Sequence, residues 1–179
     1  QGRFSHDLLF ETVLEGIPAP IKTYLHRQAA LSLEKSQGNP ARIAQHFIDA
    51  NEQDKALPFL EKAAENAERD FQRIDAANFY ERIANVLEAQ GKVDEAFEQL
   101  RKANENLTGS NLYEQSKHLI NQMFLLAHTD AQRAESYHAR AEYFIFQVRD
   151  ATAAELAARE GLKYASSPQK YADLLGNLG

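Results

Sequence analysis

The chain has no cysteine, no apolar run as long as a membrane span, and few glycines and prolines. The lack of cysteine excludes a disulfide framework and a thiolate metal site, and it is typical of a reducing compartment. A transmembrane helix needs about 20 consecutive apolar residues, and neither such a run nor a secretory leader is recognisable. We therefore predict a cytoplasmic protein without a membrane segment.

The chain also has fewer basic than acidic residues. The 26 Asp and Glu outnumber the 20 Lys and Arg, and the net charge of −6 repels a phosphate backbone. Only eight glycines and five prolines interrupt 179 residues that are rich in strong helix formers, and 44% of the residues are hydrophobic. These features predict an all-α fold that makes no direct contact with nucleic acid.

The clearest pattern is an antiparallel helical hairpin over residues 80–107. At helical spacing, one apolar stripe is followed by a second: Tyr80, Ile83, Ala84 and Leu87, then Val93, Ala96, Phe97, Leu100 and Ala103. Between them Gly91 is free to take the positive φ that ends a helix. Ala84 and Ala96 are small enough for the two helices to approach closely.

Similar patterns predict helices along most of the chain. One helix near the N-terminus carries Leu8, Leu9, Thr12 and Val13, and the next runs from about Pro20 to Lys35. Further helices are expected over 41–51, 54–69, 73–89, 93–107, 112–128, 131–148 and 150–164, with another beginning at 169. The short connections between them make neighbouring helices antiparallel.

The hairpin pattern recurs when the sequence is shifted by 40 residues. Ala44, Phe47, Asn51, Ala56, Leu60 and Ala63 then fall on Ala84, Leu87, Gly91, Ala96, Leu100 and Ala103. A weaker echo covers residues 143–162. Helix pairs that repeat at this interval indicate a solenoid. We predict a right-handed α-solenoid of about five hairpins, with residues 1–37 as an N-terminal cap and residues 38–179 as repeats truncated at the C-terminus.

The hairpin resembles a tetratricopeptide repeat. The resemblance rests on Tyr80, Ile83, Ala84, Leu87, Gly91, Ala96, Leu100 and Ala103, which stand at the intervals of that family. The shift of 40 exceeds the usual period of about 34. A second register, in which helices 54–69 and 73–89 form the pair, fits as well. The two registers differ in which face is concave, and both remain open.

The opening stretch is similar to the junction between a winged-helix-like segment and helical repeats in large bacterial ATPases of the signal-transduction class. The matching residues are Phe4, His6, Leu9, Thr12, Val13, Ile17, Pro18, Leu25, His26, Ala29 and Ala30. Phe10 and Lys22 depart from the pattern. The resemblance implies a fragment of a larger transcription regulator. The alternative is a free-standing adaptor protein.

Motifs for catalysis or cofactor binding are missing. No glycine-rich phosphate loop is present, and no histidine stands in an HExxH metal-binding motif. The six histidines are ten or more residues apart, and we interpret His26 and His46 as partly buried structural residues. We expect no catalytic, cofactor or metal site and a non-catalytic protein. An enzyme with an unrecognised site is the least favoured alternative.

Recognition is the remaining function. On helix 73–89 the face away from the predicted packing carries Asn78, Glu81, Asn85 and Glu88, which we predict to line a groove for a protein, a peptide or a neighbouring domain. The alternative is an ordinary solvated face. Because Glu81 stands where carboxylate-binding tetratricopeptide domains carry lysine, this face favours basic or neutral partners. The aromatic-rich segment 137–146 indicates either a helix buried on both sides or a docking patch.

Overall fold

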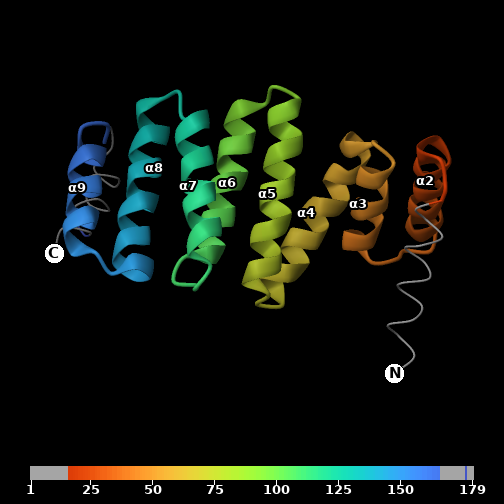
Figure 1. Ribbon diagram of the computed structural model, residues 1–179, viewed down its shortest axis with the longest axis horizontal. Coiled ribbons are helices and arrows are strands. Elements are labelled where there is room, and N and C mark those ends of the chain that lie inside the picture. The colour runs from red at the N-terminus through yellow and green to blue at the C-terminus, as the bar shows by residue number, and fades with distance from the viewer. Residues whose placement is uncertain (1–15, 166–175, 177–179) are drawn as a thin grey trace. The chain divides into compact units, whose positions relative to one another are not determined.

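The computed structural model describes residues 16–165 and residue 176. Over these residues the chain is helical and contains no strand, which confirms the all-α prediction for this part of the chain. The elements are α2 (Ala19–Lys35), α3 (Pro40–Asp49), α4 (Gln53–Arg69), α5 (Arg73–Ala89), α6 (Val93–Leu107), α7 (Tyr113–Leu126), α8 (Asp130–Glu142), the π-helix η1 (Tyr143–Val148) and α9 (Ala151–Leu162) (Figure 1). The helices predicted near the N-terminus and from 169 lie outside the described residues.

The chain divides into two compact units, residues 1–63 and 64–179. In the first unit, α2 packs on α3. Asn39 begins α3 by accepting hydrogen bonds from the backbone N–H groups of Ala41 and Arg42, at 2.9 and 3.3 Å. Phe47 on α3 is buried and stacks on Phe59 of α4, with 5.8 Å between the ring centres. This apolar contact joins α3 to the first half of α4.

In the second unit, consecutive helices from α5 to α9 pack on one another. Ala84 of α5 and Ala96 of α6 are both fully buried, as the sequence predicts for the hairpin. Their small side chains let the two helices approach closely, and Phe97, Leu100 and Leu107 of α6 fill the adjoining core.

The same turn ends α2, α3, α4 and α5. Each turn contains one residue in the left-handed region: Gln37, Asn51, Phe71 or Gly91. The next N–H then bonds the carbonyl five residues earlier, in the pairs Gly38 to Leu33, Glu52 to Phe47, Gln72 to Ala67 and Lys92 to Leu87. Asn51 and Gly91, which the shift of 40 residues aligns, therefore share the left-handed backbone conformation.

Polar side chains connect helices that are two elements apart in the second unit. Gln115 of α7 donates to Asn78 of α5 at 2.8 Å, and Asn106 of α6 donates to Glu68 of α4 at 3.0 Å. Gln132 of α8 donates to Asp94 of α6 at 2.7 Å. The pairs α4 with α6, α5 with α7 and α6 with α8 are therefore connected across the helix that lies between them in the sequence.

The predicted single helix over 131–148 is wrong in its last part, because residues Tyr143–Val148 form a π-helix. The wider turn places Gln147 in the interior, where its amide donates to the carbonyls of Leu107 and Ser110 at 3.2 and 3.1 Å and to the hydroxyl of Ser116 at 2.9 Å. A long-range polar contact of this kind leaves no periodic signal in the sequence.

Candidate functional site

The predicted groove residues lie on one face of α5. Asn78, Asn85 and Glu88 are exposed, and Glu81 is half-buried. Residue Gln115 of α7 bonds both Asn78 and Glu81, at 2.8 and 3.2 Å. His118 Nε2, also from α7, lies 3.6 Å from a carboxylate oxygen of Glu81. The N-terminal half of this face is therefore engaged by α7, while Asn85 and Glu88 remain exposed to solvent.

A more pronounced hollow lies between α7, α8, η1 and α9, within the second unit. Its volume is about 660 Å³. Apolar side chains make up much of its lining: Ile120, Phe144, Val148, Ala153, Leu156 and Ala157. Leu156 is 63% exposed although it is a large apolar residue. We call this hollow the α7–α9 pocket. Its volume is within the range of sites that bury a drug-sized molecule or a few side chains of a peptide.

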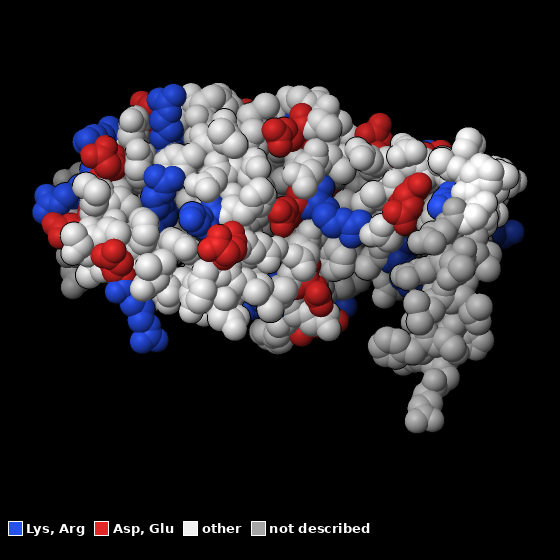
Figure 2. Space-filling view, viewed as in Figure 1, with Lys and Arg blue, Asp and Glu red and all other residues white. Residues whose placement is uncertain are grey.

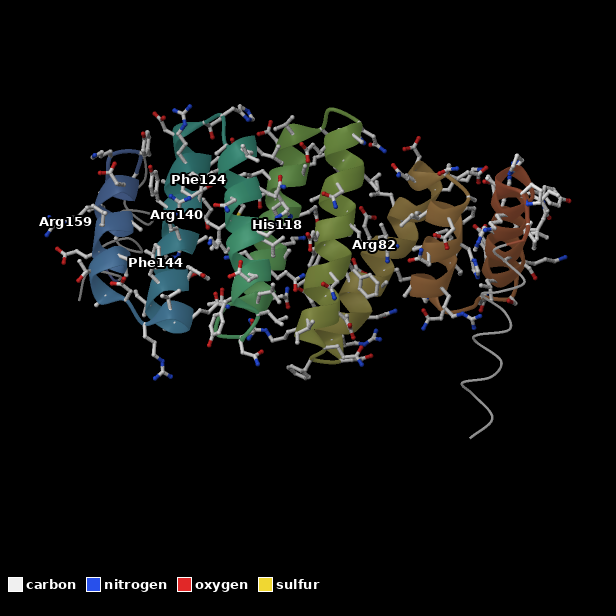
Figure 3. The ribbon with its side chains drawn as sticks, in the orientation of Figure 1. Arg82, His118, Phe124, Arg140, Phe144 and Arg159 are labelled. Carbon is white, nitrogen blue, oxygen red and sulfur yellow. The ribbon has the colours of Figure 1, made fainter. Side chains whose placement is uncertain are left out.

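Arg140 is the main polar group of the α7–α9 pocket. Its guanidinium carbon lies 3.9 Å from the centre of the Phe124 ring and 5.9 Å from that of Tyr137 (Figure 3). Partial burial lowers the pKa of Arg140, and the electrostatic effect of Tyr137 offsets this only in part. Among the described residues Arg140 forms no ion pair. A desolvated cation without an anion is unfavourable, and a ligand carboxylate would relieve that cost.

The other charges at the pocket leave it positive. Lys117 supplies a second cation and has no ion pair with any residue in the described part of the chain. Glu160, the only carboxylate among the described residues that line the pocket, is bonded by Lys163 at 2.6 and 2.7 Å. Figure 2 shows lysine or arginine side chains over α7 and α8, with acidic side chains close to them.

Aromatic contacts hold the walls of the pocket in place. Tyr137 meets the Phe124 ring edge-on, with 4.8 Å between the centres, and stacks on Tyr164 at 5.8 Å. These rings come from α7, α8 and the segment after α9. The walls are thus packed against one another before any ligand arrives, which reduces the entropy lost on binding.

A second hollow, polar and of about 610 Å³, is lined by residues of α5, α6 and α8 that include Arg73, Arg101, Glu105 and His138. The two arginines of this second hollow already have hydrogen-bond or ion-pair partners within the protein. Arg73 donates to the Glu105 carbonyl at 2.6 Å, and Arg101 pairs with Glu98 and Glu105. Although burial lowers the pKa of Arg101, the bond to Glu98 and the charges of Glu105, Glu98 and Glu135 outweigh it and raise the pKa overall. This contrast makes the α7–α9 pocket the better candidate for a ligand.

Two histidines that are far apart in sequence meet in the first unit. His26 of α2 and His46 of α3 have their Nδ1 atoms 3.0 Å apart, and Asp49 lies beside them. Burial, followed by the charge of His26, lowers the pKa of His46; Arg42 acts in the same direction and Asp49 opposes it. Both histidines are half-buried, in accord with the sequence interpretation, but their contact was not predicted.

Sequence reasoning identified segment 137–146 by its aromatic residues and missed Arg140 within it. The only signal was a basic residue between Tyr137 and Phe144. Lys117 had no such signal, because it enters the pocket from α7, about 20 residues earlier in the chain.

No protein-family model matches this chain, and no curated protein is significantly similar to it. None of the described helices combines the length and apolar character that a membrane crossing requires.

Proposed function

We propose that this chain is a non-catalytic helical-repeat module that binds a protein segment in the α7–α9 pocket. The observation that carries the proposal is Arg140, a partly buried cation without an ion pair among the described residues, at the edge of an apolar hollow. The ligand that suits this arrangement is a peptide that places an apolar side chain against Phe144 and Leu156 and a carboxylate near Arg140.

The proposed architecture is a tetratricopeptide-like solenoid. Two features support it: in the second unit three helices bond their second neighbours, as stacked hairpins do, and the four helices α2 to α5 end in the same turn. The repeated turns at Asn51, Phe71 and Gly91 occur every 20 residues, which is one helix and its connection. This regularity is compatible with both sequence registers.

The setting we propose is a larger bacterial ATPase-type transcription regulator, in which filling the pocket shifts the balance between inactive and active forms. This rests on the resemblance of residues 1–37, and a free-standing adaptor is the alternative. The prediction of basic or neutral partners concerns the α5 face and stays a prediction there. The pocket has the opposite charge and favours an acidic ligand.

The proposal can be tested with a random peptide library displayed with free C-termini. We expect enriched sequences to carry an acidic group, a side chain or the C-terminus, next to an aliphatic or aromatic residue. Synthetic versions in which the acid is amidated should bind about tenfold more weakly or worse, as expected for loss of a charge-assisted bond. Amidating the C-terminus and the side chain separately distinguishes the two sources of the carboxylate.

Matched variants locate the binding site. Arg140→Met retains most of the apolar stem and removes the charge. Arg159→Met makes the same change at an arginine of α9 that is exposed and already paired with Glu155 (Figure 3). Binding should weaken about tenfold in the first variant and stay unchanged in the second, and Leu156→Ala should also weaken it. Enriched peptides without an acid, or equal binding by the two arginine variants, would overturn the proposal.

A further inference from the structure

The first unit holds a cluster of potential metal ligands that shares no residue with the α7–α9 pocket. His26 on α2 and His46 on α3 turn the same ring nitrogen, Nδ1, toward each other at 3.0 Å. Asp49 follows His46 by three residues, so it lies on the same face of α3. Its Oδ2 atom is 3.6 Å from His26 Nδ1, and the three potential ligand atoms all lie within 4.8 Å of one another.

These separations fit one bound metal ion. Two ligand atoms on a tetrahedral Zn²⁺, with bonds of about 2.0–2.1 Å, are about 3.3–3.4 Å apart. The observed 3.0 and 3.6 Å fall on either side of that value, and the third pair, His46 and Asp49, lies within 4.8 Å, so the three side chains would need to close around the ion as it binds. A set of two imidazoles and one carboxylate favours Zn²⁺ and related transition metals over Mg²⁺ and Ca²⁺, which prefer oxygen ligands.

The surroundings orient the carboxylate and leave the three side chains accessible to solvent. Gln45 donates to Asp49 Oδ1 at 2.7 Å, which leaves Oδ2 on the side of the histidines. The side chains of His26 and Asp49 are 24% and 33% exposed, so a water molecule can complete the coordination. Arg42 is a nearby cation that opposes metal binding, and the negative charge of Asp49 offsets it.

We propose that His26, His46 and Asp49 form a binding site for one Zn²⁺ ion that links α2 to α3. Two protein ligands come from α3 and one from α2, so the ion would act as a cross-link between the helices. Because the ligands are assembled only in the folded chain, binding would stabilise this unit. At least one coordination position would remain for water or for a group from a partner.

The test uses the whole chain, freed of any histidine tag and of metal by chelation. Equilibrium dialysis against ZnCl₂, followed by elemental analysis, should find about one tightly bound Zn²⁺ per chain, and MgCl₂ should give none. Thermal unfolding should shift upward with Zn²⁺. NMR of the imidazole nitrogens should show the Nδ1 signals of two histidines moving on titration. Absence of stoichiometric Zn²⁺ would overturn the proposal.

Single substitutions test whether each of the three residues binds the metal. His26→Gln, His46→Gln and Asp49→Asn should each weaken Zn²⁺ binding at least about tenfold. His128→Gln is the control, since this histidine is exposed and lies beside Asp94 in the second unit. Circular dichroism of the metal-free variants establishes that each one folds. If the three variants bind Zn²⁺ as tightly as the wild type, or if His128→Gln alone loses it, the assignment is wrong.

Discussion

Arg140 of α8 covers the face of the Phe124 ring of α7, with 3.9 Å between the guanidinium carbon and the ring centre. Such a contact stabilises a fold by about 0.5–2 kcal/mol, but here it is opposed by the burial of a cation without an ion pair among the described residues. We expect Arg140→Met to change the free energy of unfolding by less than about 1 kcal/mol, as measured by urea denaturation. A loss of more than about 2 kcal/mol would show that Arg140 is mainly structural.

Phe71 adopts a left-handed conformation, with φ of 57°, and its side chain is 89% exposed. A side chain in this region costs about 1–2 kcal/mol, while glycine loses about 0.5–1 kcal/mol more backbone entropy on folding. Phe71→Gly should therefore stabilise the fold by about 0.5–1 kcal/mol.

Gly91 provides the reciprocal test, because its φ is 74° and a Cβ there would contact nothing within 4 Å. Gly91→Ala should destabilise the fold by about 0.5–1 kcal/mol through backbone conformation alone. Unfolding midpoints that move in the same direction for both variants would contradict the assignment of these turns.

Gln147 joins the π-helix to the end of α6, to the loop after it and to α7 through hydrogen bonds to Leu107, Ser110 and Ser116. Gln147→Met fills a similar volume but leaves acceptors unsatisfied, so we expect a loss of about 2 kcal/mol in chemical denaturation. Gln115→Met is the control, because the partners of Gln115 can be hydrated; it should cost less than about 1 kcal/mol. Similar losses in the two variants would argue against a special role for the π-helix.

Ala84 and Glu88 test the assignment of the two faces of α5. Ala84 is 1% exposed, so Ala84→Leu should overpack the α5–α6 contact and cost about 1–3 kcal/mol. Glu88 is exposed, so Glu88→Ala should be nearly neutral. Equal shifts of the unfolding midpoint would show that the faces are wrongly assigned.

Tyr80 should make stability depend on pH in alkaline solution. Burial, together with a hydrogen bond to Glu68 and the charges of Glu68 and Glu65, raises the pKa of its phenol from 10.0 to about 12. The folded state then holds the proton more tightly than the unfolded state. The stabilisation is complete below pH 10 and is lost as the pH rises toward 12, by at most about 2–3 kcal/mol. Denaturation of wild type and Tyr80→Phe between pH 9 and 12 should show this loss only in the wild type.

The helices were predictable because their causes are local. Apolar residues at helical spacing, as at Tyr80, Ile83 and Leu87, form a stripe whether or not a neighbour is known, and Gly91 ends a helix by its own backbone freedom. The left-handed turn at Phe71 was not predictable in this way, since a phenylalanine has no preference for that backbone conformation. The π-helix was missed because it depends on the bonds that Gln147 makes with residues 31–40 positions earlier in the chain.

The candidate sites were decided by tertiary structure. Asn78 and Glu81 could be placed on one face of α5 from spacing alone, but only packing brings Gln115 of α7 against them. Likewise, the contact between His26 and His46 arises because α2 packs on α3, and the pocket at Arg140 arises because four elements leave a gap between them. Local sequence determines a helix and its apolar face, since both depend on neighbouring residues. Which polar side chains meet depends on how distant helices stack, and that is a property of the folded chain.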